Sequence, residues 1–304
     1  MTELLSRDKP TLGAILNALD KRMTLLPNDR LTLQSIQKGN EGELYFDSLM
    51  TQYVNCESIA LKNLVIVHNG IIIQIDSLLI TSNGVYLYEV KNYAGDYSCQ
   101  NSQIKSLHRS TYLDPIAQLE RTTTVINNLL TSWNYRMPIS AHVVFVHPTF
   151  VLYEAKVGDP ILFLPQLPRH LKKVNQKADY LDKRHHALAE NLLQEASKDV
   201  PFERKLPDYS YEQLKKGLTC VTCGSFDLVN NSKSSWCKTC GEHHSLNEMI
   251  LHQIKEFRLL FPNEPVTRNI IHEWCGGQLT ERRVYSLLQS TFKRVGQGKS
   301  SYYI

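Results

Sequence analysis

Residues 71–92 read IIIQIDSLLITSNGVYLYEVKN, and this stretch decides the fold of the first part of the chain. Two runs rich in β-branched and aromatic residues flank Asn83-Gly84, the dipeptide most typical of a two-residue hairpin turn. If Asn83 and Gly84 are the two turn residues, Ser82 faces Val85 across the hairpin. The stretch therefore predicts two antiparallel strands in this register.

The same register brings three charged residues together. Asp76 faces Lys91, and Glu89 shares their face because side chains alternate along a strand. The apolar residues are divided between Ile72, Leu78, Ile80, Val85 and Leu87 on the charged face, and Ile71, Ile73, Ile75, Leu79 and Val90 on the other. A strand that is apolar on both faces indicates a central strand covered on both sides.

Two carboxylates and an ammonium in such a sheet require partners, because an unpaired buried charge is costly. One interpretation is a structural ion pair between Asp76 and Lys91 at the end of the sheet. The other is an active site in which Asp76 and Glu89 bind a hard cation such as Mg²⁺ while Lys91 orients or deprotonates water. The hairpin alone leaves both interpretations open.

Composition suggests a cytoplasmic protein of two or three domains. The chain has 304 residues and 42% hydrophobic residues, with no apolar run long enough to span a membrane and no signal-peptide pattern at its start. Seven cysteines, four of them clustered, suit metal binding better than disulfides. Residues 1–200 hold 20 basic and 20 acidic residues, so the formal charge of +4 comes from residues 201–304, with 14 against 10. A nucleic-acid contact is expected in that last third.

The N-terminal part is predicted to form two helices. A short amphipathic helix covers residues 11–23, and a longer one begins after residue 28 or 29 and runs to about residue 53. In the longer helix, Glu43 lies on the apolar stripe. It either caps a kink at Gly39 or Gly42, because glycines weaken helices, or supplies a third acid to the hairpin site.

The remaining elements suggest a mixed sheet. Asn69-Gly70 predicts an earlier hairpin, so the first three strands form an antiparallel meander. A helix over residues 114–130 leads to a buried fourth strand over residues 141–147, which should run parallel to the third. Other segments are expected to form a polar loop (93–110), a short strand (161–164), helical structure (168–197) and a linker (200–217).

Four motifs occur in order: helical Gly42-Glu43, the Asp76 hairpin, Glu89-Val90-Lys91-Asn92, and Asp114-Pro115-Ile116-Ala117-Gln118. Over roughly residues 35–165 they resemble the nuclease-related domain (NERD) family, whose last motif usually has Asn before the proline. A D/E-x-K tripeptide alone is weak evidence, but the ordered set is much stronger. The family is similar to the PD-(D/E)xK restriction-endonuclease-like fold. The resemblance therefore implies an α/β fold: an antiparallel meander, a crossover helix and a parallel fourth strand, flanked by helices.

The resemblance also implies roles for individual residues. Asp76 and Glu89 would bind Mg²⁺ or Mn²⁺, Lys91 would be the catalytic lysine, Glu43 an auxiliary acid, and Gln118 the glutamine that positions water or phosphate. Asp114 replaces the usual Asn, a mild departure because both residues cap helices. A nuclease fold does not by itself establish activity.

A second motif predicts a zinc site. Two CxxC-Gly knuckles supply the ligands Cys220, Cys223, Cys237 and Cys240, and the glycine after each pair permits a tight turn. Four thiolates leave no open position, so the zinc would be structural. A redox CxxC and a metal-free ribbon are the alternatives, although no βαβ context supports the first. His243 and His244 are taken as spectators or as caps for the next helix.

The C-terminal part is predicted to be helical. Ser245, Thr267 and Thr280 each cap a helix, and Gly276-Gly277 separate the last two in the manner of a helix-turn-helix. With residues 295–304 as a wing, the segment looks like a small winged-helix module. Its nucleic-acid face would comprise Arg282, Arg283, Gln289, Lys293 and Arg294. The alternative is a small helical domain that contacts other proteins.

These observations predict a metal-dependent nuclease that hydrolyses phosphodiester bonds, with DNA favoured over RNA as substrate. The expected domains are a nuclease-like domain with N-terminal helices (1–199), a linker (200–217), a Cys₄ zinc ribbon (218–244) and a winged-helix-like module (245–304). The alternative is a catalytically inactive nucleic-acid-binding or regulatory protein with the same fold. No membrane partner is expected, and a homodimer is the default expectation because cleaving two strands needs two sites.

Overall fold

The computed structural model describes residues 1–5, 12–100, 103–108, 112–196, 206–298 and 301–304. The chain divides into two compact units, one of Met1–Lys9 with Ser35–Phe202 and one of Pro10–Gln34 with Glu203–Ile304. The expected division at residue 199 differs from this, because residues 10–34 group with the C-terminal part. Parts of several predicted segments lie outside the described residues: the helix start at 11, residues 101–102 and 109–110 of the expected loop, residue 197 of the expected helical segment, linker residues 200–205, and tail residues 299–300.

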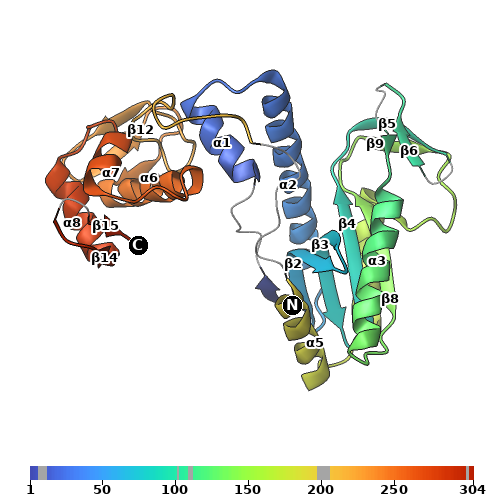
Figure 1. The fold of residues 1–304 in the computed structure, drawn as a ribbon. Coiled ribbons are helices and arrows are strands. Elements are labelled where there is room, and N and C mark those ends of the chain that lie inside the picture. The colour runs from blue at the N-terminus through green and yellow to red at the C-terminus, as the bar shows by residue number, and fades with distance from the viewer. Residues whose placement is uncertain (6–11, 101–102, 109–111, 197–205, 299–300) are drawn as a thin grey trace. The chain divides into compact units, whose positions relative to one another are not determined.

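A six-stranded mixed sheet is the centre of the first unit (Figure 1). In spatial order its strands are β1 (Thr2–Leu5), β2 (Ile59–His68), β3 (Ile71–Thr81), β4 (Gly84–Lys91), β8 (Ile139–Phe145) and β10 (Ile161–Phe163). Strands β2, β3 and β4 form the predicted antiparallel meander, and β8 runs parallel to β4. The α/β fold with a parallel fourth strand is thereby confirmed. The edge strand β1, parallel to β2, was not predicted.

The first hairpin turns at the predicted dipeptide. Asn69 and Gly70 have φ of 50° and 78°, and His68 pairs with Ile71 across the turn. These positive φ values are what a type I′ turn requires at both central positions. Asparagine and glycine tolerate them better than other residues, so this part of the meander follows from local sequence.

The second hairpin differs from the predicted register. Thr81 pairs with Gly84, so the loop residues are Ser82 and Asn83 rather than Asn83 and Gly84. Gly84 is the first residue of β4, and a Cβ there would lie 2.6 Å from the backbone oxygen of Pro138. The glycine is therefore required for close strand packing, not for the turn. Extended to Asp76, this register places Glu89, not Lys91, across from it.

The alternation of faces also shifts within β2 and β3. Ile73 and Ile75 belong to the same core cluster as Leu78 and Ile80, so their assignment to the opposite face was wrong. The shift coincides with Asn63 on the paired strand, whose φ of 51° interrupts the regular pleat. Ile71 and Ile72, at the start of β3, are exposed rather than covered.

Helices cover both faces of the sheet. They are α2 (Pro27–Tyr53, of which residues 35–53 lie in this unit), α3 (Pro115–Ser132), α4 (Leu167–Lys177) and α5 (Lys183–Glu195), with the short 3₁₀ helix η1 (Leu164–Gln166) before α4. On one face, α3 and α5 cover the core that contains Leu78 and Leu87. On the other, α2 and α4 cover the core that contains Leu79 and Val90. The predicted crossover helix is α3, drawn in green along β8 in Figure 1.

A second, four-stranded sheet occupies the region expected to be a polar loop. Its strands are β7 (Tyr112–Leu113), β6 (Gln103–Ser106), β5 (Gly95–Gln100) and β9 (Phe150–Tyr153), in that spatial order. Cys99 and Ile104 from this sheet pack with Leu119 of α3 and Phe145 of β8. The small sheet therefore extends from the end of β4 and shares a core with the main sheet.

The second unit combines an N-terminal helix with the C-terminal part of the chain. Its elements are α1 (Leu12–Arg22), β11 (Leu228–Asn230), β12 (Ser234–Cys237), β13 (His243–Ser245), α6 (Leu246–Leu260), α7 (Arg268–Trp274), α8 (Glu281–Thr291), β14 (Arg294–Val295) and β15 (Tyr302–Tyr303). The predicted caps Ser245, Thr267 and Thr280 accept hydrogen bonds from the first turns of α6, α7 and α8. No helix among the described residues combines the length and hydrophobicity needed to cross a bilayer.

Arg22 links α1 to the rest of this unit. Its buried guanidinium donates to Glu256 Oε1 at 2.5 Å, to Gln253 Oε1 at 2.5 Å and to the Lys215 carbonyl at 2.6 Å. It also lies 3.9 Å from the centre of the Trp274 ring. A buried charge needs such partners, which explains why this helix packs with residues more than 200 positions away.

Candidate active site and metal centre

The candidate active site begins where β3 and β4 stop pairing. The last pair of this ladder is Ser77 with Tyr88, and the next residue of β3 is Asp76. Its Oδ2 accepts a hydrogen bond from the Val90 backbone N–H at 2.8 Å. Only 7% of Asp76 is exposed, so the backbone contact holds a nearly buried carboxylate at this end of the two strands.

Glu89 and Lys91 lie on the same face at the end of β4. Lys91 Nζ donates to Glu89 Oε1 at 2.5 Å and to Gln118 Oε1 at 3.3 Å. Gln118 comes from the first turn of α3, which begins after the N-cap Asp114 and Pro115. The Asp114 side chain accepts a hydrogen bond from the Ala117 N–H, as the N-cap residue of a helix typically does. Lys91 therefore bridges the strand and the helix.

The charges of this cluster influence one another. Burial, and then the neighbouring charge of Asp76, raise the pKa of the Glu89 carboxyl to about 7, although Lys91 acts in the opposite direction. Burial, the largest single influence, would lower the pKa of the Lys91 ammonium, but the charges of Glu89, Tyr93 and Asp76 together with the hydrogen bond to Glu89 outweigh it, and the pKa is raised. The site thus contains a carboxyl that is only partly ionised at neutral pH beside a lysine that remains charged.

Glu43 joins the site from α2 because Gly42 allows the helix to come close. Gly42 is buried, and a Cβ there would lie 2.5 Å from Cβ of Asn92 and 3.2 Å from Val146. Half-buried Glu43 adds to the charges that raise the pKa of Glu89. The close approach, rather than a helix kink, explains the glycine at position 42.

Two residues that directly follow Lys91 complete the surroundings: Asn92, which the sequence placed in the motif without a role, and Tyr93, which it did not single out. Asn92 Nδ2 donates to the Lys38 carbonyl at 2.8 Å, which ties the end of β4 to α2. Burial raises the pKa of Tyr93, with the charge of Lys91 opposing it. The Tyr93 ring also stacks on Tyr97 of the small sheet, with centroids 5.9 Å apart. The position of Asn92 and Tyr93 directly after the Glu89-Val90-Lys91 motif was the signal in the sequence that could have indicated their place beside the site.

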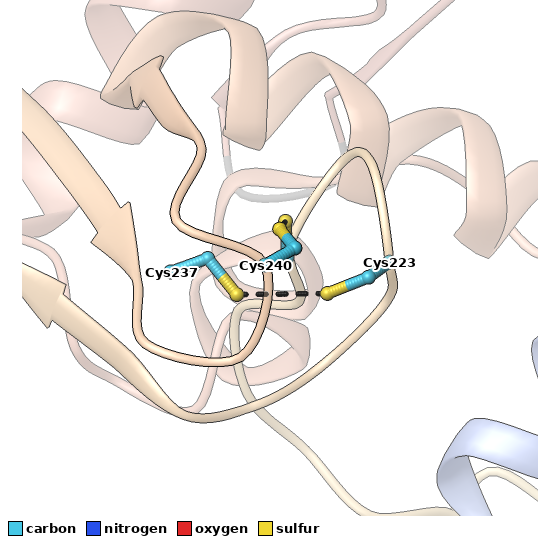
Figure 2. Close-up of side chains that lie close together, drawn as sticks. Cys223, Cys237 and Cys240 are labelled. Carbon is cyan, nitrogen blue, oxygen red and sulfur yellow. Dashed lines mark hydrogen bonds between the residues drawn. The ribbon is translucent and has the colours of Figure 1, made fainter.

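The four predicted zinc ligands lie together in the second unit. The sulfur atoms of Cys220, Cys223, Cys237 and Cys240 all lie within 4.8 Å of one another, a grouping that could hold a metal ion. Figure 2 shows Cys223 and Cys237 pointing toward each other, and their sulfurs are 3.5 Å apart. The predicted cluster is therefore present as a set of four thiols.

The two knuckles have the backbone that the sequence predicted. Gly224 and Gly241 have φ of 71° and 78°, and their N–H groups donate to the carbonyls of Cys220 and Cys237 at 2.9 Å. Burial opposes ionisation of Cys237, but N–H groups of Cys240 and Thr239 lower its pKa to about 6. Turns that stabilise a thiolate suit a soft metal such as zinc. The donor set therefore fits a Cys₄ zinc site.

The two histidines after the second knuckle differ in their surroundings. His244 Nε2 lies 3.9 Å from Cys220 Sγ and 3.1 Å from Thr222 Oγ1, and its Nδ1 lies 3.3 Å from Glu248 Oε1. His243 is exposed on the other side of β13. His244 therefore borders the thiol cluster, while His243 faces solvent.

The predicted nucleic-acid face is only partly free of contacts within the protein. Arg282, Gln289, Lys293 and Arg294 are exposed on α8 and the residues that follow it. Arg283 is half-buried, and its guanidinium donates to the Ser232 carbonyl at 2.5 Å and to Asn247 Oδ1 at 3.4 Å. These contacts join α8 to the turn between β11 and β12 and to the first turn of α6. Arg283 therefore has a structural function in this unit.

Comparison with known families gives a match within the first unit. Residues 38–146 match the family model of the nuclease-related domain (NERD). This range contains Glu43, Asp76, Glu89, Lys91 and Gln118, and it runs from the middle of α2, where that helix approaches Asn92, to the residue after β8. No curated protein and no solved structure matched the chain. Residues 38–146 are therefore similar to the nuclease-related domain, as the ordered motifs predicted.

Proposed function

We propose that this nuclease-related domain is the catalytic part of a Mg²⁺- or Mn²⁺-dependent nuclease that hydrolyses phosphodiester bonds, with DNA as the favoured substrate. The observation that carries the proposal is the convergence of Asp76, Glu89, Lys91 and Gln118 at the end of β4. The proposed site therefore combines two neighbouring carboxylates, a lysine and an amide in one place.

The carboxylates suit a hard divalent cation. Asp76 and Glu89 would be its ligands, with Glu43 as an auxiliary acid, because Mg²⁺ and Mn²⁺ prefer oxygen donors. The raised pKa of Glu89 supports this assignment, since a buried carboxyl beside a second carboxylate lacks sufficient positive charge. When bound, the cation would lower the pKa of the attacking water and neutralise charge that develops on the phosphate.

Lys91 and Gln118 would act on the phosphate and the water. The raised pKa of Lys91 keeps it an ammonium at neutral pH, so it is better suited to donate to a phosphate oxygen or to orient water than to accept a proton. Gln118 Oε1 accepts a hydrogen bond from Lys91 Nζ. The same amide oxygen could also accept a hydrogen bond from the attacking water. Both residues would thus position the reacting groups.

The second unit would deliver the nucleic acid. We assign structural zinc to the Cys₄ cluster, and a winged-helix-like role to α7, α8 and the β14–β15 hairpin. The exposed residues Arg282, Lys293 and Arg294 would contact phosphates. Arg283, which is half-buried and donates to the Ser232 carbonyl, would contribute less to this face than the exposed arginines.

A catalytically inactive nucleic-acid-binding protein is the second candidate. The observation in its favour is the 2.5 Å contact between Lys91 and Glu89, which would also serve as a structural ion pair. In that case the charged cluster would stabilise the fold without turning over substrate. Cleavage assays separate the two functions.

The test is cleavage of plasmid, linear and single-stranded DNA, and of RNA, with Mg²⁺ or Mn²⁺. We expect Asp76→Ala and Lys91→Ala each to lower the cleavage rate about 100- to 1000-fold or more, because each removes a ligand or a charge aimed at the phosphate. Gln118→Ala should also reduce it. The matched control Glu120→Gln, an exposed residue on the same helix, should cleave normally. Cleavage that persists in Asp76→Ala and Lys91→Ala would reject the proposed site.

A further inference from the structure

The zinc-ribbon sheet presents a continuous exposed face. Val229 of β11 pairs directly with Trp236 of β12, and Trp236 pairs directly with His243 of β13. Directly paired residues point to the same side of a sheet. The three side chains therefore form one row across the ribbon, which we name the Trp236 row.

The opposite face of the same sheet is occupied by the protein itself. Ser235 and Cys237, the neighbours of Trp236 on β12, are 2% and 1% exposed, whereas Trp236 is 40% exposed. Cys237 also belongs to the thiol cluster, so metal binding would hold β12 in place behind the row. The Trp236 row therefore lies on a strand that is fixed from behind, and the large ring of Trp236 faces solvent.

The rings of this row have the geometry of a stacking surface. Trp236 and His243 have ring centroids 6.1 Å apart and planes within 20° of parallel. Scattered exposed apolar residues are ordinary on protein surfaces. Trp236 and His243, with Val229, itself 45% exposed, form instead a contiguous row of exposed side chains, and a further planar ring can extend the stack of the two rings.

Positive charge lies at both ends of β12. Lys233 and Lys238 flank the strand and are exposed. Lys238 pairs with Asp227 at 3.5 Å, but both side chains are more than half exposed, so this pair is weak. An exposed aromatic row with a lysine at each end of its central strand matches the chemistry of an unpaired nucleobase with phosphates on both sides.

We propose that the Trp236 row is a binding site for an unpaired nucleobase of a single-stranded nucleic acid. The base would stack on Trp236 and His243, while Lys233 and Lys238 would contact the adjacent phosphates. The proposal extends the assigned role of the second unit, and it rests on the proposed function only in that both require nucleic acid as ligand. A base inside a duplex is already stacked, so the row would favour single strands, frayed ends or gaps over intact duplex.

The test measures binding by the full chain, without added Mg²⁺ or Mn²⁺, to a fluorescent single-stranded DNA oligonucleotide, its RNA equivalent and a duplex. Trp236→Ala should weaken single-strand binding about tenfold and leave duplex binding nearly unchanged, because one stacked base is lost. Trp236→Phe keeps a ring and should stay within about threefold. The control Tyr180→Ala removes a ring that is 88% exposed outside the ribbon and should have no effect.

A second measurement does not depend on how well Trp236→Ala folds. Single-stranded DNA should quench tryptophan fluorescence of the wild type more than that of Trp236→Phe, and the difference reports Trp236 alone. A zinc content of one per chain checks that each variant keeps its ribbon. An equal loss on DNA and RNA supports base stacking without sugar preference, and a loss on only one of them names the substrate.

The proposal is overturned if single strands bind zinc-loaded Trp236→Ala as tightly as the wild type, or if saturating DNA leaves the Trp236 signal unchanged. Either result would mean that the Trp236 row does not bind a nucleobase, and its exposed rings would then suit contact with another protein. Failure of the nuclease proposal looks different, because binding would still depend on Trp236 while no variant cleaved. Conversely, if Asp76→Ala abolishes cleavage while Trp236→Ala binds single strands as tightly as the wild type, only the proposal for the Trp236 row is rejected.

Discussion

Glu89 binds a proton more tightly in the folded chain than in the unfolded one. Its pKa is about 7 in the structure, against an ordinary value of 4.5, because the carboxyl is buried beside Asp76. A raised carboxyl pKa means that the folded state loses stability as pH rises from the unfolded value to the folded one. At neutral pH the ionised Glu89 therefore destabilises the folded chain, and a bound cation would offset this destabilisation.

This leads to a test of metal binding by pH. In metal-free protein, we expect the free energy of unfolding to fall by about 3 kcal/mol as pH rises from about 4.5 to about 7, through the Glu89 contribution alone. Glu89→Gln has no such group, so the difference between wild type and variant isolates it. Melting temperatures measured in chelator across this range provide the measurement.

Added Mg²⁺ or Mn²⁺ should raise the melting temperature of the wild type more at pH 8 than at pH 6, because the cation competes with the proton on Glu89. The Glu89→Gln variant should lose most of this rise. If the two proteins show the same dependence on pH and metal, Glu89 is not the titrating ligand.

Local sequence was sufficient to group Asp76, Glu89 and Lys91, even though the predicted turn was wrong. The true register moves the partner of Asp76 by two residues, from Lys91 to Glu89. A shift of two residues keeps every side chain on its original face, whereas a shift of one would have reversed them all. The contact of Asp76 with the Val90 N–H, which depends on the strands separating, had no signal in the sequence.

At the scale of elements, the two Asn-Gly dipeptides had different outcomes. Asn69-Gly70 forms the predicted turn, whereas Gly84 serves the contact between β4 and Pro138. The small sheet was missed because its strands are short and partly polar, and because β5 pairs with the distant β9. Pairing between segments more than 50 residues apart has no local pattern to reveal it.

The packing of α2 against the end of β4 can be tested with two glycines of one helix. A Cβ at position 42 would lie 2.5 Å from Asn92 Cβ, whereas a Cβ at position 39 would meet nothing within 4 Å. We expect Gly39→Ala to stabilise the protein by up to about 1 kcal/mol, because alanine favours helix. Gly42→Ala should instead destabilise it, by about 1 to 3 kcal/mol.

Chemical denaturation and the cleavage assay together provide the readout. Because Glu43 follows Gly42, the forced shift of α2 should also reduce cleavage in Gly42→Ala, while Gly39→Ala should cleave normally. Equal stability of the two variants would show that α2 does not depend on this close approach.

At the scale of the whole molecule, the chain order and the compact units do not coincide. Along the sequence, the first unit's residues 35–202 are inserted between α1 and the C-terminal elements with which α1 packs. Composition and helix patterns located α1 correctly along the chain, but they could not say which core it joins. That choice depends on one buried side chain, Arg22, and its partners Gln253 and Glu256.

The Arg22 network should dominate the stability of the second unit. Arg22→Met leaves Glu256, which is 6% exposed, without its charged partner, so we expect a loss of about 3 to 5 kcal/mol. Adding Glu256→Gln removes the unpaired charge and should restore much of it. Unfolding of the full chain, followed by the fluorescence of buried Trp274, is the measurement.

The matched control is another arginine ion pair near α1. Arg30 and Asp20 are 3.7 Å apart with side chains 53% and 38% exposed, so Arg30→Met should cost less than about 1 kcal/mol. Equal losses for Arg22→Met and Arg30→Met would contradict the role of the buried network.

The Arg22 contact also has a consequence for synthesis of the chain. Arg22 and Glu256 are 234 residues apart, and a ribosome adds about 5 to 20 residues per second. The apolar side of α1 therefore remains without its partner helix for roughly 12 to 47 s, long enough for the first unit to fold before that helix is made. During that interval α1 is a free amphipathic segment, and a chaperone that binds such segments would find it exposed on every growing chain.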